Sequence, residues 1–261
     1  MLRALYTSST GMYGQQLNID AIAHNVSNVN TIGFKKSRVN FQDLLYQTIR
    51  KPVASEEIMQ PVGLQIGLGT RPAAIQTLFP QGNLSPTGNP LDVAISGDAF
   101  FQVEVPGYDE PLYTRNGAFM IDGEGNLVTS DGYYVIGADT IEPGAHDISV
   151  ATDGTITYKL PDDDQVIEAG RLELARFINP NGLEKVGGSL YRATEVSGEP
   201  EDWDPEGDST VRLHGGYLEM SNVQIVEEMV NLITAQRAYE FNSKSIQSAD
   251  EMLGMAANLK R

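Results

Sequence analysis

The sequence contains no cysteine. Without thiols, disulfide bridges, thiolate metal sites and cysteine nucleophiles are all excluded. Long apolar runs are also missing, and no stretch approaches the about 18 residues of a membrane-spanning helix. The chain starts with MLRALYTSST, which has one charge and several hydroxyl side chains where a secretory signal would have its apolar centre. We therefore expect no membrane span, and either a cytosolic protein or one exported without a cleaved signal peptide.

Positive charge is scarce in the chain. It has 18 lysines and arginines against 35 acidic residues, which gives a net charge of −17. The acids concentrate between Asp139 and Asp208, whereas the first sixty residues are close to neutral. Nucleic-acid binding needs a basic surface for the phosphates, so this charge argues against it. A small basic cluster, Lys35, Lys36 and Arg38, is interpreted as a solvated segment rather than a phosphate site.

Recognisable catalytic and metal-binding motifs are missing as well. The stretch GLGTRP begins like a dinucleotide-binding loop, but its third glycine is absent and Pro72 would break the following helix. A calcium loop starting at Asp202 would need Glu at its twelfth position, where Leu213 stands. The three histidines are far apart and have no ligand spacing. We expect no catalytic, metal or cofactor site, and so no enzyme.

Each end of the chain shows an apolar repeat of seven residues, which is typical of helices that pack along their length. No proline interrupts either end, so we expect two long helices, of about 25 and about 38 residues. We expect the repeats to form the self-assembly faces of these helices. These faces are Leu5, Met12, Ile19, Ile22 and Val26 at the N-terminus, and Ile225, Leu232, Tyr239, Ile246 and Leu253 at the C-terminus.

A second row of mostly small residues runs three positions beyond the C-terminal repeat, and small residues favour close helix packing. Two helices that touch only one another leave their other faces uncovered, so they should order fully only against neighbours. This pattern favours a self-assembling subunit over the alternative, two core helices of a globular domain. The second row is Glu228, Ala235, Asn242, Ala249 and Ala256.

The middle of the chain reads as short strands separated by frequent turns. The sequence DGEG at 122–125 predicts a hairpin between its flanking strands, and Asp-Gly and Asn-Gly pairs mark other turns. Strands this short and evenly spaced indicate an all-β domain, either a sandwich or barrel-like. The expected strands are 91–95, 99–105, 118–121, 126–129, 133–136, 148–150, 155–158 and 171–177.

The stretch 41–89 fits neither pattern, because it holds five prolines, several glycines and only short apolar pieces. A structureless loop this long is unusual inside a compact domain, so we expect an extended arm that orders against a neighbour. The predicted fold class is α+β, in which long terminal helices form a coiled-coil domain around an extended linker and an all-β middle. The predicted boundaries are 1–30 and 217–261 for the helices, 31–88 for the linker and 89–216 for the β domain.

Both ends of the chain resemble known signatures. The sequence NVSNVNTIGFK, 25–35, resembles the N-terminal signature of bacterial flagellar rod and hook proteins, and NVQIVEEMVNLITAQRAYEFNSKSI, 222–246, resembles their C-terminal signature. LDVAISGDAFFQV and YTRNGAF resemble the β domain of the larger members. The signature residues are Asn25, Asn28, Asn30, Thr31, Gly33 and Phe34, with Gln236, Arg237, Ala238, Tyr239 and Asn242.

The linker refines this resemblance. Three stretches of this chain resemble the linker region of distal rod subunits, a region that hook proteins lack. They are DLLYQTIRKP, GLQIGLGTRP and QGNLSPTGNPLDVAI. Two departures are mild: His24 stands where asparagine is usual, and Val26-Ser27 replaces the common Leu-Ala. The alternatives are another axial protein, such as a proximal rod or hook subunit, and a β-sandwich enzyme or sugar-binding module on a helical stalk.

The resemblance implies a structural role in the basal body of the bacterial flagellum. Copies would assemble helically into a rigid tube that spans the periplasm and transmits torque from the motor to the hook, with the terminal helices inside. Export would use the flagellar type III apparatus. Partners would be proximal rod proteins, the hook protein and the P and L ring proteins as a bushing. We expect the linker 41–89 to be the source of the stiffness of the tube. We expect the acidic surface to prevent adhesion to a surrounding sleeve of similar charge.

Overall fold

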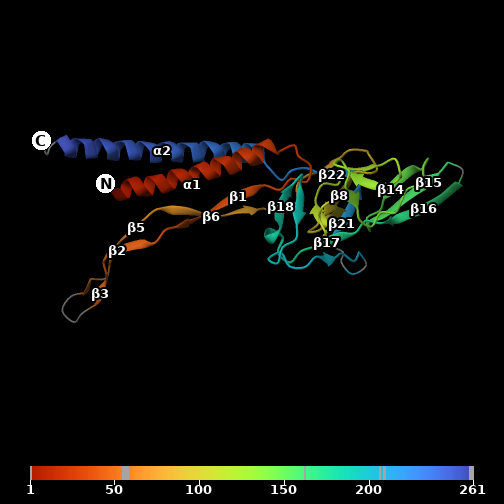
Figure 1. Cartoon of the computed structure of the whole chain (residues 1–261), viewed down its shortest axis with the longest axis horizontal. Coiled ribbons are helices and arrows are strands. Elements are labelled where there is room, and N and C mark those ends of the chain that lie inside the picture. Colours follow the sequence, from red (N-terminus) through yellow and green to blue (C-terminus); the bar gives the residue numbers. More distant parts are fainter. Residues whose placement is uncertain are drawn as a thin grey trace. The chain divides into compact units, whose positions relative to one another are not determined.

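The structure is a computed structural model that describes residues 2–54, 59–60, 62–161, 163–205, 207 and 210–258. Figure 1 shows two long helices, α1 (Leu2–Ser27) and α2 (Ile225–Asn258), and a series of short strands between them in the chain. The chain divides into two compact units. The helical unit comprises 1–27, 37–76 and 224–261, and the β unit comprises 28–36 and 77–223.

In the helical unit, α1 and α2 lie side by side (Figure 1). They run antiparallel, because Asn25 near the end of α1 contacts Glu228 at the start of α2, while Gly11 lies against Asn242. Neither helix contains a proline, and the first turn of α2 holds Glu227 and Glu228, where carboxylates favour the positive end of the helix dipole.

The helical unit also contains three ribbons of two antiparallel strands. They occupy most of the segment in which the sequence predicted an extended arm, and every described residue of the middle ribbon is exposed. The strand pairs are β1 (Ser37–Asp43) with β6 (Thr70–Thr77), β2 (Tyr46–Arg50) with β5 (Leu64–Gly67), and β3 (Val53–Ala54) with β4 (Met59–Gln60).

The largest sheet of the β unit has nine strands and centres on β9 (Phe100–Glu104). One side of β9 pairs with β10, and the other side pairs with β13 and β17. The remaining strands of this sheet are β10 (Leu112–Thr114), β11 (Phe119–Ile121), β12 (Leu127–Thr129), β13 (Tyr134–Val135), β17 (Leu174–Arg176), β18 (Glu184–Gly187), β19 (Leu190–Arg192) and β20 (Glu201–Asp202).

Smaller sheets complete the β unit, and alternate residues of the strands fill one main core that includes Phe101, Phe119 and Leu213. A second, aromatic cluster contains Phe100 and Tyr113. The smaller sheets are β14 (His146–Val150), β15 (Thr155–Leu160) and β16 (Asp163–Arg171) together, β8 (Val93–Ser96) with β21 (Arg212–Gly215), and β7 (Leu84–Pro86) with β22 (Tyr217–Glu219).

Terminal helices and a mostly β middle confirm the predicted α+β class. The coiled coil, the extended linker and the four domain boundaries stay predictions. The structure ends α1 at Ser27 and places 217–219 in a strand ahead of α2, while 259–261 lie outside the described residues. Residues 162, 206 and 208 of the acidic segment also lie outside them.

Charge is divided unequally between the units. The helical unit contains equal numbers of acidic and basic residues, so the whole excess of 17 acidic residues lies in the β unit. A neutral helical unit can pack against other copies without long-range repulsion, whereas the β units of neighbouring copies would repel one another.

Candidate functional site

The two helices meet through small and polar side chains. On α2 the buried residues are Glu228, Ala235 and Ala249, all in one row with a spacing of seven, and Asn242 of the same row is half-buried. A side-chain carbon added at Gly11 of α1 would lie 2.9 Å from Nδ2 of Asn242. The two helices can therefore lie this close only because the side chains between them are small, as the second row of mostly small residues predicted.

Asn25 joins three segments of the helical unit. Its Nδ2 donates to the carbonyl oxygen of Ser37 at 2.8 Å and to Oε2 of Glu228 at 3.2 Å, and its Oδ1 accepts from the Ser37 backbone N–H at 2.9 Å. The side chain is 2% exposed. The amide thus ties the end of α1 to both α2 and β1, which explains why an asparagine stands at this position.

The predicted self-assembly faces have mixed exposure within one subunit. Ile22 is buried, whereas Ile225 and Tyr239 are 49% and 39% exposed. The remaining members of both faces are half-buried: Leu5, Met12, Ile19, Val26, Leu232, Ile246 and Leu253.

A second apolar face runs along α2. Val226 is 76% exposed, Val230 57% and Ile233 49%, with spacings of four and three residues. Since successive helical residues are about 100° apart, this face lies opposite the row of Glu228 and Ala235 that contacts α1. The outer face of α2 is defined as Val226, Met229, Val230, Ile233, Phe241, Met252 and Met255, all of them exposed.

The N-terminal signature builds a tight turn at the start of the β unit. The carbonyl of Asn28 accepts the Thr31 N–H at 3.2 Å, and its Oδ1 accepts the Thr31 hydroxyl at 3.2 Å. Gly33 has φ +66° and donates its N–H to the carbonyl of Glu219 at 2.8 Å. A side-chain carbon at this position would lie 2.6 Å from the backbone carbonyl carbon of Arg115, so only glycine fits.

Next to this turn, one carboxylate is shared by two cations. Glu219 lies 2.6 Å from Nζ of Lys35 and 3.4 Å from a guanidinium nitrogen of Arg115, and the side chains are each 1% exposed. The carboxylate also accepts the Gly82 N–H at 2.8 Å. Burial lowers the pKa of Lys35, as does Arg115, whereas Glu219 raises it. The expectation that Lys35 is solvated is therefore wrong.

Asn222 completes this cluster. It accepts the Lys36 N–H at 2.8 Å and donates to the carbonyls of Leu78 and Pro80 at 3.0 and 3.1 Å. The segments 33–36, 78–82 and 219–222 each adjoin a point where the chain passes between the units. These three segments are thus held together inside the β unit by Glu219 and Asn222.

The roles of Glu219, Arg115 and Asn222 were not predicted from the sequence, because these polar residues belong to no repeating pattern of apolar and polar positions. A faint signal existed for Lys35, Arg115 and Asn222, which lie within the family-like stretches 25–35, 113–119 and 222–246. The remaining signature residues lie as follows: Phe34 is buried, Asn30, Gln236, Arg237 and Tyr239 are exposed, and Ala238 and Asn242 are half-buried.

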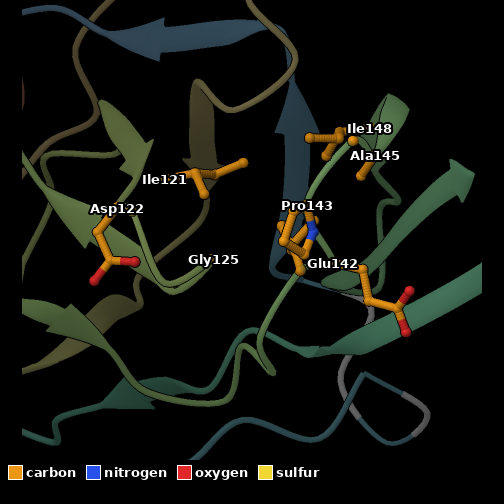
Figure 2. A pocket seen from close by; sticks show the side chains of 10 residues that line it. Ile121, Asp122, Gly125, Glu142, Pro143, Ala145 and Ile148 are labelled. Carbon is orange, nitrogen blue, oxygen red and sulfur yellow. The ribbon is translucent and has the colours of Figure 1, made fainter.

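A small cavity of about 200 Å³ lies beside the β11–β12 hairpin (Figure 2). Asp122 lines it, but its carboxylate already accepts the N–H groups of Glu124 and Asn126, each at 2.9 Å. The hydrogen bond from Asn126 is the main cause of the lowered pKa of Asp122. Asp122 therefore stabilises the predicted turn, and no group of three or more metal-binding side chains occurs among the described residues.

Within the described part of the chain, no helix is long and apolar enough to cross a membrane. Three family models match the sequence: the flagella basal body rod protein at 5–35, the flagellar hook protein FlgE/F/G D1 domain at 94–158, and the flagellar basal body rod FlgEFG protein C-terminal family at 214–259. The paired helices, the signature turn and the β unit thus define a flagellar rod or hook type of protein.

Similar curated proteins narrow this class. The chain is 46% identical to the flagellar basal-body rod protein FlgG of Borreliella burgdorferi, over all of both chains. It is 45% identical to FlgG of Buchnera aphidicola over 97% of this chain and 98% of the other, and 39% identical to FlgG of Bacillus subtilis over both full lengths. The chain belongs to the family of flagellar basal-body rod proteins FlgG.

Proposed function

We propose that the protein is the subunit of the distal rod, and that its copies assemble helically into a rigid tube that transmits torque from the motor to the hook. As a family member it is a structural protein of the flagellar basal body. The helical lattice, the periplasmic position and export through the type III apparatus without a cleaved signal belong to the proposal.

The outer face of α2 carries this proposal. It displays large apolar side chains along most of a 34-residue helix, from Val226 at 76% exposure to Met255 at 60%. Apolar surface of this extent on a helix is unfavourable in water and marks a packing site. On α1, Tyr6 and Tyr13 are also more than half exposed, at 59% and 58%. Neighbouring copies cover these faces in the tube.

The exposed ribbon supports the proposed role in stiffness. In β2 and β5 every side chain is exposed, and an isolated two-stranded ribbon is marginally stable in water. Leu64 and Ile66 lie on one face of this ribbon and Tyr46 on the other, so contact with a neighbouring copy would cover apolar groups. A ribbon wedged between copies would block the sliding that bending requires.

The proposed partners are other copies of the chain, proximal rod proteins at the near end, the hook protein at the far end, and the P and L ring proteins around the rod. The acidic excess of the β unit supports its placement on the outside of the tube, where like charges are solvated and screened. A surrounding sleeve of similar charge would then not adhere to it. Neutralising several acids should slow rotation if this explanation holds.

Complementation tests the proposed function. Cells that lack their own distal rod subunit should swim when given this chain, and should fail to build a hook when given Val230→Asp. The substitution places a charge in the outer face of α2, on the side of the helix opposite the buried row of Glu228 and Ala235. Normal swimming with the aspartate would overturn the role of this face.

A further inference from the structure

A groove of about 930 Å³ lies on one face of the nine-stranded sheet in the β unit. Its floor contains Tyr113 of β10 and Gln102 of β9, which lie directly opposite one another and so point to the same face. A volume of this size is within the range of small-molecule sites. It is called the Glu199 groove, after a glutamate in its lining.

Negative charge dominates the lining of this groove. It contains four glutamates, Glu110, Glu184, Glu195 and Glu199, and one cation, Arg192. The guanidinium of Arg192 is already paired with Glu184. The carboxylates of the other three glutamates form no ion pair or hydrogen bond with another described residue. The groove therefore presents three uncompensated negative charges.

The hydroxyl of Tyr113, at the floor of the groove, forms no hydrogen bond with any described residue. The side chain is nevertheless 2% exposed, and a polar group shielded from water gains from a hydrogen bond. Burial raises the pKa of Tyr113 to about 12, with smaller contributions from Glu110 and Asp202, so the hydroxyl is neutral at ordinary pH. A cationic donor would therefore find a neutral acceptor among negative charges.

The side-chain donors of the groove are already engaged. Nε2 of Gln102 donates to Asp202 at 3.2 Å, and Arg192 is paired as described above. The hydroxyl of Thr194 donates to the carbonyl of Gly182 at 2.7 Å. The side chains that remain free offer oxygen acceptors, which match a ligand that only donates. A peptide segment would also need donors for its carbonyl groups.

A single metal ion does not fit this arrangement. Among the described residues, no group of three or more acidic or histidine side chains is close enough to hold a metal. The free carboxylates are thus spread along the groove, and a ligand that neutralises them needs several positive charges at separate points.

We propose that the Glu199 groove binds a linear aliphatic polyamine, a small molecule whose ammonium groups are separated by methylene chains. The ammonium groups pair with the free glutamates and donate to the hydroxyl of Tyr113, while the methylene chain lies against Pro111 and Pro200. This inference goes beyond the proposed function and does not depend on it, because one copy contains the whole groove.

Isothermal titration of the full chain with spermidine tests the proposal, at low ionic strength and below the concentration at which copies assemble. We expect one binding site per chain. Tyr113→Phe keeps the ring and removes only the hydroxyl, so it should weaken binding at least about fivefold. The pair Glu110→Gln and Glu199→Gln should weaken it to a similar degree.

The matched control is the pair Glu124→Gln and Glu142→Gln, which removes the same charge from exposed positions outside the groove. It should change the affinity less than about twofold, because exposed charges at a distance are screened. Circular dichroism first establishes that every variant is folded.

Three results overturn the proposal: no saturable binding of spermidine, equal loss of affinity in the two glutamate pairs, or unchanged affinity of Tyr113→Phe. Tighter binding of a trilysine peptide with blocked termini, which carries the same charge as spermidine, also overturns it and assigns the groove to a basic protein segment. Failure of the proposed function is seen separately, in the complementation experiment, and leaves this measurement unaffected.

Discussion

The ammonium group of Lys35 lies 2.6 Å from the carboxylate of Glu219, and both side chains are 1% exposed. Glu219 is also 3.4 Å from Arg115. One carboxylate thus serves two buried cations next to the segments through which the chain passes between its units. Breaking a buried ion pair leaves an uncompensated charge, which costs far more than breaking an exposed one.

Glu219→Gln should therefore destabilise the β unit by about 3–5 kcal/mol, since two buried cations lose their counter-ion. Lys35→Met should cost less, because Glu219 keeps Arg115. Chemical denaturation of the full chain measures both values.

Glu184→Gln is the matched control, because Glu184 pairs with Arg192 at the surface, where the side chains are 53% and 44% exposed. This change should cost about 0–1 kcal/mol. Equal effects of Glu219→Gln and Glu184→Gln on the free energy of unfolding would show that the buried cluster contributes no more stability than an exposed ion pair.

Asn25 should be sensitive to truncation. Asn25→Ala removes hydrogen bonds to Glu228 and to both backbone groups of Ser37, and we expect a loss of about 1–3 kcal/mol. Amide exchange should show faster opening at the end of α1 and in β1. Asn30→Ala, at an exposed signature position, should change stability by less than about 0.5 kcal/mol. Unchanged exchange in Asn25→Ala would contradict the structural role of this amide.

Alkaline pH should destabilise the β unit through Tyr113. Burial, and then the nearby Glu110, raises the pKa of this tyrosine from 10.0 to about 12. Above pH 10 the unfolded chain loses this proton before the folded chain does. The contribution of Tyr113 to the free energy of unfolding is therefore fully present below pH 10 and is lost as pH rises towards 12. The contribution is about 2–3 kcal/mol. Tyr113→Phe should flatten the fall measured by denaturation between these pH values, and an identical slope would refute this assignment.

Shortening the exposed ribbon should soften the tube. Removing residues 53–60, which include β3 and β4, leaves the residues of the helices and of the β unit unchanged, so copies should still assemble. Without the distal part of the wedge, neighbouring copies should slide, and electron microscopy should show curved filaments. Straight filaments after this deletion would eliminate the ribbon as the source of stiffness.

The helices and the hairpin followed from local sequence. Helix periodicity and the absence of proline suffice for α1 and α2, and DGEG in the predicted turn gave the hairpin in which Phe119 pairs with Thr129. These patterns extend over a few residues each, so they predict local structure without any knowledge of the contacts made by the rest of the chain.

Contacts between residues that are far apart in the chain could not be predicted from the sequence. The burial of Lys35 depends on Glu219, 184 positions away, and a lysine alone is most often solvated. The middle ribbon escaped prediction because its strands β2 and β5 have no buried face, and so no alternation of apolar and polar residues. The face of α2 that contacts α1 was ambiguous, because α2 carries two apolar faces.

The central claim is that copies assemble through the outer face of α2. Electron microscopy of the concentrated full chain, beside Ile233→Asp and Ser245→Asp, tests it most directly. Ile233 belongs to this face, whereas the exposed Ser245 lies between the two faces of the helix. Circular dichroism first establishes equal helix content. The account predicts straight tubes from the unsubstituted chain and from Ser245→Asp, and none from Ile233→Asp. Tubes of equal number and length from Ile233→Asp would contradict it.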